Sequence, residues 1–201
     1  MSSAALQRLP GSALYGLVAL VALFEVGALW LALHPNVPSD YRAYYIDATT
    51  TCLNQPVSGA YAQGTLIPFR SGYEKLITPL RVCGWEGPAG DGLHAVGESA
   101  RLRLALLGSA HNVHLRLDMV AVDFAGAAGQ PVDVIVNGTT VGQAQVATGI
   151  PQRFDFTVPD VVLGPRKVLD IELAFPNAIR VDPQDSNTRK RSIKLTAVQA
   201  G

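Results

Sequence analysis

Residues Gly11 to Leu33 read GSALYGLVALVALFEVGALWLAL, an apolar stretch whose single charge is Glu25. As a helix, these 23 residues at about 1.5 Å each cover the roughly 30 Å hydrocarbon core of a bilayer with a small tilt. A cleaved secretory signal would combine a basic start, a shorter apolar stretch and a small-residue cleavage site. Only Arg8 is basic ahead of the stretch, and the bulky Trp30 and Leu31 stand where cleavage would occur. We therefore predict a retained transmembrane helix in contact with the lipid bilayer.

The orientation of this helix follows from what flanks it. Arg8 before the helix is balanced by Arg42 after it, so the positive-inside rule is nearly neutral. A long segment with two cysteines follows the helix, and such segments cross the membrane largely regardless of charge. We predict a single-pass membrane protein with its N-terminus inside and its C-terminal domain outside the cytoplasm. Its parts are a cytoplasmic tail (residues 1–10), the transmembrane helix (11–33), a Pro-containing stalk (34–50) and an extracytoplasmic domain (51–201).

Glu25 lies near the middle of the helix. A carboxylate there costs about 2.5–3.5 kcal/mol on insertion scales unless it is protonated, paired or facing water. Two alternatives stay open: Glu25 meets a donor on another subunit, or it is protonated and tolerated by its apolar neighbours. Ser12 with Gly16 gives a small-xxx-small spacing that lets a second helix approach closely. Glu25, Ser12 and Gly16 are therefore the candidate contacts with integral membrane protein subunits.

The only two cysteines, Cys52 and Cys83, lie in the predicted extracytoplasmic domain. In an oxidising compartment such a pair most simply forms a disulfide. The two thiols are too far apart in sequence for a CxxC redox pair, and no histidine cluster accompanies them, so a metal site is not supported. We predict a structural disulfide, no metal and no cofactor.

The formal net charge of +0 argues against a nucleic-acid partner.

Beyond residue 100 the pattern of apolar residues changes to a period of two. Arg101–Leu106 and Val113–Met119 alternate aliphatic with polar residues, as half-buried strands do. Asn137-Gly138 supplies the positive-φ pair of a hairpin turn between two further strands. The pattern predicts an all-β fold, an antiparallel jelly-roll β-sandwich, behind the transmembrane helix. The remaining expected strands cover residues 132–136, 140–146, 152–158, 168–175 and 191–198, with one or two more between 59 and 81.

Several motifs resemble those of a known group of domains. The run Cys83-Gly84-Trp85-Glu86-Gly87-Pro88, with Gly90-Asp91-Gly92 and Gly97 before the alternating strand at 100–106, resembles the opening of a jelly-roll domain. That domain is similar to carbohydrate-binding modules and is attached to many bacterial membrane glycosyltransferases and other envelope glycan proteins. Val132–Gly138 looks like its V-x-V-N-G strand, and Asp185–Leu195 like its closing D-x-R-x-L-x-L strand. The chain departs from the pattern at Ala89, where Glu is frequent, and at Leu93-His94-Ala95, where a second Trp is frequent.

This resemblance implies a bacterial inner-membrane protein with a periplasmic C-terminal domain. It also implies a glycan ligand, either a polysaccharide or a lipid-linked glycan. Sugar sites use aromatic rings that stack on pyranose faces and carboxylates or amides that bond hydroxyls. Trp85 is the candidate platform, with Glu86, Asp91 and His94 in the same predicted loop as hydroxyl partners. The alternative, which we favour for Trp85, is packing at the edge of the core, with a solvated polar loop beside it.

Catalytic motifs are absent from the sequence: it holds no G-x-S-x-G elbow, no H-E-x-x-H and no P-loop. Asp170 and Glu172 are explained as outward polar positions of a half-solvated sheet. We therefore predict a protein that is not an enzyme but an accessory subunit of a larger integral membrane complex, whose sandwich contacts partner subunits and glycan. Two alternatives are a pure scaffold of a photosynthetic or respiratory complex without a ligand, and a dedicated polysaccharide-binding module of a glycan synthase.

Overall fold

The computed structural model describes residues 11–46, 52–106, 112–123, 129–165, 167–180, 184 and 189–201. The chain divides into two compact units, Met1–Ser39 and Asp40–Gly201. The predicted tail, residues 1–10, and the side chain of Ser12 lie outside the described residues. The first four residues of the closing motif, 185–188, also lie outside them.

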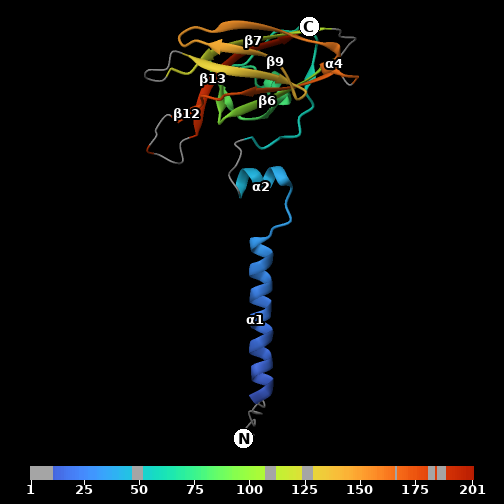
Figure 1. Ribbon diagram of the computed structural model, residues 1–201, viewed down its shortest axis with the longest axis vertical. Helices are drawn as coiled ribbons and strands as arrows, with labels where there is room; N and C mark the ends of the chain where they lie inside the picture. Colours follow the sequence, from blue (N-terminus) through green and yellow to red (C-terminus); the bar gives the residue numbers. More distant parts are fainter. Residues whose placement is uncertain are drawn as a thin grey trace. The chain divides into compact units, whose positions relative to one another are not determined.

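Helix α1 spans Gly11–Leu33 and has the predicted bounds (Figure 1). Large apolar side chains are exposed at consecutive positions, for example 60% of Val18, 72% of Leu23 and 76% of Phe24. The stretch Ala13–Leu33 has a mean hydropathy of 2.2, and none of it is buried within the chain. Among the described residues it is the one helix long and apolar enough to cross a membrane. A helix that is apolar on every face and unburied in its own chain is suited to lipid rather than water.

Helix α2 spans Ser39–Tyr45, inside the segment expected to be a stalk. This helix was not predicted from the sequence. The ring of Tyr45 packs against those of Tyr41 and Tyr44, with centroids 4.6 and 4.7 Å apart. The contact between Tyr41 and Tyr45 joins residues four apart, and such pairs stabilise a short helix.

The second unit holds two β-sheets. In the described residues the first sheet has the order β1-β6-β11-β8-β9, with β3 also paired to β6. Its strands are β1 (Ala60–Tyr61), β3 (Arg81–Cys83), β6 (Ser99–Leu106), β8 (Gln130–Val136), β9 (Thr139–Val146) and β11 (Val168–Ala174). The described strand pairs are antiparallel except for β1 with β6.

The second sheet has the order β10-β7-β13-β5-β4, and β2 and β12 also pair with β13. Its strands are β2 (Ile67–Pro68), β4 (Trp85–Ala89), β5 (Gly92–Val96), β7 (Val113–Ala121), β10 (Gln152–Val158), β12 (Ile179–Arg180) and β13 (Lys190–Ala200). Three short helical turns complete the unit: α3 (Glu74–Ile77), the 3-10 turn η1 (Thr78–Leu80) and α4 (Asp160–Leu163).

Aliphatic side chains from both sheets form one core. On β6, Leu102 and Leu104 are buried while Arg101 and Arg103 face outward, and β7 and β11 follow the same alternation. Residue Asn137 has φ +50° and Gly138 has φ +81°, which makes the predicted hairpin turn between β8 and β9. The prediction of an all-β sandwich behind an apolar helix is therefore confirmed.

Candidate functional site

The four residues predicted to share a glycan-binding loop lie mainly on strands. Trp85 and Glu86 are on β4, His94 is on β5, and only Asp91 lies in the turn between these strands. The prediction that they share a single loop is therefore wrong. Strands β4 and β5 pair with each other, and β5 also pairs with β13. The glycines and Pro88 do not prevent these backbone hydrogen bonds.

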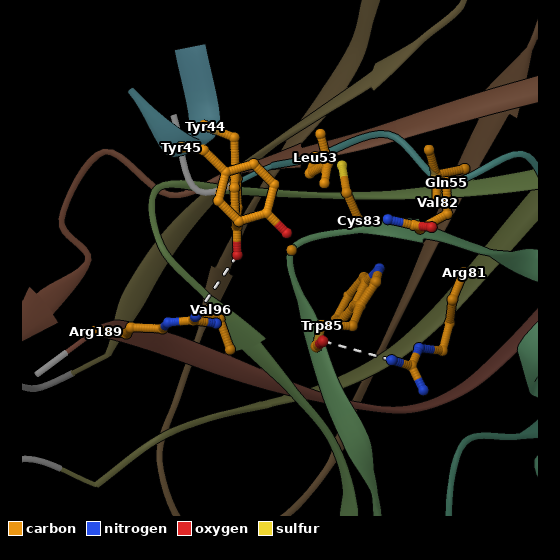
Figure 2. Close-up of a pocket in the computed structure, with 11 residues that line it drawn as sticks. Tyr44, Tyr45, Leu53, Gln55, Arg81, Val82, Cys83, Trp85, Val96 and Arg189 are labelled. Carbon is orange, nitrogen blue, oxygen red and sulfur yellow. Dashed lines mark hydrogen bonds between the residues drawn. The ribbon is translucent and has the colours of Figure 1, made fainter. Parts of the chain in front are cut away.

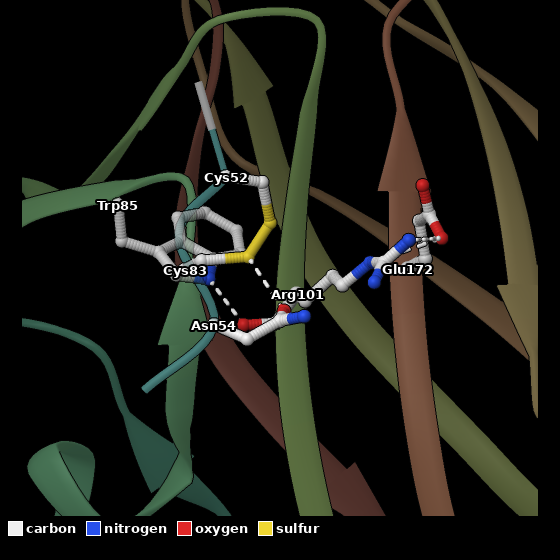
Figure 3. The surroundings of a disulfide bond; sticks show 6 residues. All are labelled: Cys52, Asn54, Cys83, Trp85, Arg101 and Glu172. Atoms are coloured by element: carbon white, nitrogen blue, oxygen red, sulfur yellow. Dashed lines mark hydrogen bonds and ion pairs between the residues drawn. A yellow bond between two sulfur atoms is a disulfide. The ribbon is translucent and has the colours of Figure 1, made fainter. Parts of the chain in front are cut away.

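Trp85 is 9% exposed and belongs to the core. Its indole Nε1 donates to the carbonyl of Arg101 over 2.9 Å (Figure 3). Since β4 belongs to the second sheet and β6 to the first, this hydrogen bond ties the two sheets together. The ring thus occupies the core-edge position that the sequence analysis favoured over a stacking platform.

The polar members of this group are held by cations of β13. Glu86 forms an ion pair with Arg191, and Asp91 accepts from the Lys194 ammonium over 2.5 Å. The Asp91 carboxylate also lies 3.8 Å from His94 Nε2. The hydrogen bond from Arg191 holds the pKa of Glu86 below its usual value, and that from Lys194 does the same to the pKa of Asp91. Asp91 and His94 are brought together, while Glu86 pairs with a different cation.

These lowered pKa values give a prediction for acid stability. A carboxylate whose pKa is lower in the folded state stabilises fully above its unfolded pKa, here near the ordinary values of 4.5 and 3.8. That stabilisation is lost as the pH falls through the folded pKa. We expect the melting temperature to fall more steeply from roughly pH 5 to pH 3 in the wild type than in the Glu86→Gln/Asp91→Asn double variant. Melting curves of both proteins across this range test it, and parallel profiles would contradict it.

A second polar region lies on the outward face of the first sheet, where a hollow of about 560 Å³ opens over β6 and β11. Arg101 Nη2 donates to Glu172 Oε2 over 2.7 Å. Arg103 donates from Nε and Nη2 to the two oxygens of Asp170 over 2.6 and 3.1 Å, and this partner raises the pKa of Arg103. Each pair lies directly opposite in the antiparallel register of the two strands.

The predicted disulfide holds in place the segment that forms one side of this hollow. Cys52 and Cys83 are bonded, with Cα atoms 4.9 Å apart, and both side chains are buried (Figure 3). Asn54 Oδ1 lies 3.6 Å from Cys83 Sγ, and the backbone N–H of Gln55 donates to the carbonyl of Val82 over 2.9 Å. The bridge therefore keeps the amide side chains of Asn54 and Gln55 at the rim of the hollow, where both contribute to its lining.

A smaller pocket of about 260 Å³ lies beside β3 and β4 (Figure 2). Its lining includes the rings of Tyr44, Tyr45 and Trp85 and the guanidinium groups of Arg81 and Arg189. Sequence reasoning missed both this pocket and the hollow. The alternating Arg-x-Arg at 101–103 and Asp-x-Glu at 170–172 showed which side chains face outward, but not that the two strands are neighbours.

Within the described ranges, no three His, Cys, Asp or Glu side chains gather as metal ligands would. The predicted intramembrane contacts lie on α1, where Glu25 is exposed and a Cβ at Gly16 would meet no atom within 4 Å.

Comparison with protein-family models finds no match, and comparison with curated proteins finds none either. Solved structures with a similar arrangement include a carbohydrate-binding module CBM36 in complex with calcium and xylotriose, at 14% identity over 59% of this chain and 87% of that one, TM-score 0.35. The CBM36-1 domain of a multidomain xylanase from the hindgut metagenome of Trinervitermes trinervoides matches at 13% identity over 67% and 94%, TM-score 0.36. A family 35 carbohydrate-binding module from an environmental isolate matches at 10% identity over 69% and 82%, TM-score 0.36. Similarity at this level transfers no ligand and no binding residue to this chain.

Proposed function

We propose that this protein is a non-catalytic, membrane-anchored accessory subunit of a larger integral membrane complex. In this proposal α1 spans a bacterial inner membrane with its N-terminus in the cytoplasm, and the sandwich lies in the periplasm. The observation that carries the proposal is the central Glu25 on a helix that is otherwise apolar on every face. No hydrogen bond or ion pair joins Glu25 to any described residue of its own chain. A carboxylate at that depth, at a cost of about 2.5–3.5 kcal/mol, is most readily retained if another subunit supplies its partner.

The sandwich supports a structural role in an oxidising compartment. Its cysteines are joined in a disulfide, which is typical of extracytoplasmic proteins. On the described surface, most exposed carboxylates of the sheets are held by arginine or lysine side chains, for example Asp155 by Arg116 and Asp118 by Arg153. Paired carboxylates of this kind provide neither a free general base nor an activated nucleophile.

Gentle extraction of the full chain tests this proposal. We expect a tagged chain, extracted from its native membrane in digitonin, to elute with integral membrane subunits at fixed stoichiometry by size exclusion and quantitative mass spectrometry. Glu25→Leu should reduce the recovered partner about tenfold, corresponding to about 1.4 kcal/mol. Glu25→Gln, which still hydrogen bonds, should retain more, and Val26→Leu should change nothing. Elution of the wild type as a monomer alone would contradict the proposal.

The hollow over β6 and β11 favours a second candidate function, contact with a polysaccharide or a lipid-linked glycan. Its two arginines and two carboxylates balance, so the hollow carries no net charge and suits a neutral ligand. Sugar hydroxyls both donate and accept, and the hollow offers both capacities through the Arg101 and Glu172 pair and the amides of Asn54 and Gln55.

Glycan binding can be measured on the full chain in detergent micelles. We expect envelope oligosaccharides to shift the melting temperature or the tryptophan emission, and Arg101→Gln to weaken that binding at least tenfold. Arg153→Gln, which removes a paired arginine of the other sheet, is the matched control. Loss of binding in Asp91→Asn/His94→Gln instead would assign the glycan to the β4–β5 face. A flat response across a broad panel would contradict glycan binding altogether.

A further inference from the structure

Arg81, at the start of β3, differs from most arginines of the sandwich because no described carboxylate pairs with it. Its Nη2 donates to the carbonyl of Trp85 over 3.5 Å, a long hydrogen bond. Its Nε is buried without any partner in the described part of the chain. By contrast, five other arginines have carboxylate partners: Arg101, Arg103, Arg116, Arg153 and Arg191.

The position of Arg81 explains why its charge is poorly solvated. It lies opposite Leu102 in the register of β3 with β6, and Leu102 is 1% exposed and faces the core. Arg81 therefore occupies an inward-facing position at the rim of the sandwich, where burial lowers the pKa of its guanidinium. A desolvated cation without a counter-ion is unfavourable, so an anion beside it would bind more strongly than at an exposed arginine.

The pocket beside Arg81 has the charge and walls for such an anion. Arg189 supplies a second guanidinium, and among the described residues its Nη2 contacts the Tyr44 hydroxyl over 3.5 Å. Among the described residues that line the pocket there is no Asp or Glu. The nearby carboxylate of Glu86 also attracts Arg189, but its ion pair is with Arg191. In Figure 2, Trp85 lies between Arg81 and Arg189 in the view, and all three residues line the same pocket.

We propose that this pocket binds an oxyanion, a phosphate, sulfate or carboxylate group of a small ligand, through Arg81 with Arg189 as the second cation. A guanidinium presents parallel N–H groups that match two oxygens of such a group. This site is distinct from the neutral hollow over β6 and β11 and goes beyond the proposed accessory role. Its failure would leave the co-purification and oligosaccharide experiments unaffected.

The chain provides its own probe for this binding. It contains two tryptophans, Trp30 in α1 and Trp85 in the pocket wall. In the full-length Trp30→Phe variant in zwitterionic micelles, emission therefore reports on Trp85 alone. We expect saturable changes on titration with phosphate, sulfate and acetate at constant ionic strength set with sodium chloride, which separates binding from screening. A comparison of glucuronate with glucose then tests for an acidic sugar as the source of the oxyanion. A comparison of anionic with zwitterionic lipid nanodiscs tests for a lipid headgroup.

Matched variants assign the binding to the pocket. Arg81→Gln should weaken oxyanion binding at least tenfold. Arg81→Lys keeps the charge but loses the parallel N–H groups of the guanidinium, and it should weaken binding less. Arg189→Gln, at an exposed position, should weaken it about threefold without affecting the fold. Arg153→Gln should stay within twofold of the parent. No saturable response to any oxyanion, or equal affinity in the parent and both Gln variants of the pocket arginines, would overturn the proposal.

Discussion

Alanine in place of Gly84 is expected to destabilise the sandwich by about 2–5 kcal/mol, the sum of a strained backbone and an overpacked contact. Gly84 joins β3 of the first sheet to β4 of the second, so the chain crosses between the sheets at this residue. Its φ of +76° is one that a side chain disfavours. A Cβ there would lie 2.3 Å from the Ser99 carbonyl oxygen and 2.6 Å from the Ala100 Cα. These are backbone atoms, so no rotamer change relieves the contact.

Gly87 provides the matched control for this prediction, because it lies three residues further along, on β4. It does not adopt a positive φ, and a Cβ there would meet no atom within 4 Å. Gly87→Ala should therefore be neutral or stabilise by up to about 1 kcal/mol. Urea unfolding of both variants in the Trp30→Phe background, followed by Trp85 emission, measures the difference. Equal destabilisation of the two variants would contradict the crossing geometry.

The sequence was sufficient for those elements whose pattern is decided locally. Helix α1 was predicted with its observed bounds because an unbroken apolar stretch of this length has few alternatives. Strands β6, β7 and β11 were predicted because their aliphatic residues alternate strictly. In these segments the local sequence alone shows which side chains are buried and which are exposed.

Elements that depend on distant partners were not predictable in this way. Strands β4 and β5 contain one glycine each, and β4 also contains Pro88; these residues are turn signals. The pairing of β5 with β13, about 100 residues later, overrides these signals. The hollow needs β6 to lie beside β11, and alternation does not identify neighbours. Arg81 carries no sequence signal, since its inward position follows only from its register with Leu102.

Removal of the disulfide is the second change with a large expected effect. In the Cys52→Ser/Cys83→Ser double variant, we expect unfolding free energy to fall by about 3–4 kcal/mol, because the bridge closes a loop with a sequence separation of 31. Reduction of the wild type should give the same loss, and a reductant should have no effect on the double variant. A wild type that is insensitive to the reductant would contradict the prediction.

The same variant separates stability from ligand contact, because the bridge also holds the rim of the hollow. The segment before β1 is attached to the first sheet by the bridge, by the Gln55 N–H to the Val82 carbonyl over 2.9 Å, and by the Ala105 N–H to the Gly59 carbonyl over 2.7 Å. Without the bridge, Asn54 and Gln55 lose their fixed position. Gln55 also lines the pocket of Arg81, so under conditions where the double variant remains folded both affinities should fall. Oligosaccharide affinity should fall more, since Arg81 itself is held by the register of β3 with β6. An equal fall in both affinities would show that the bridge positions the whole first sheet rather than its rim.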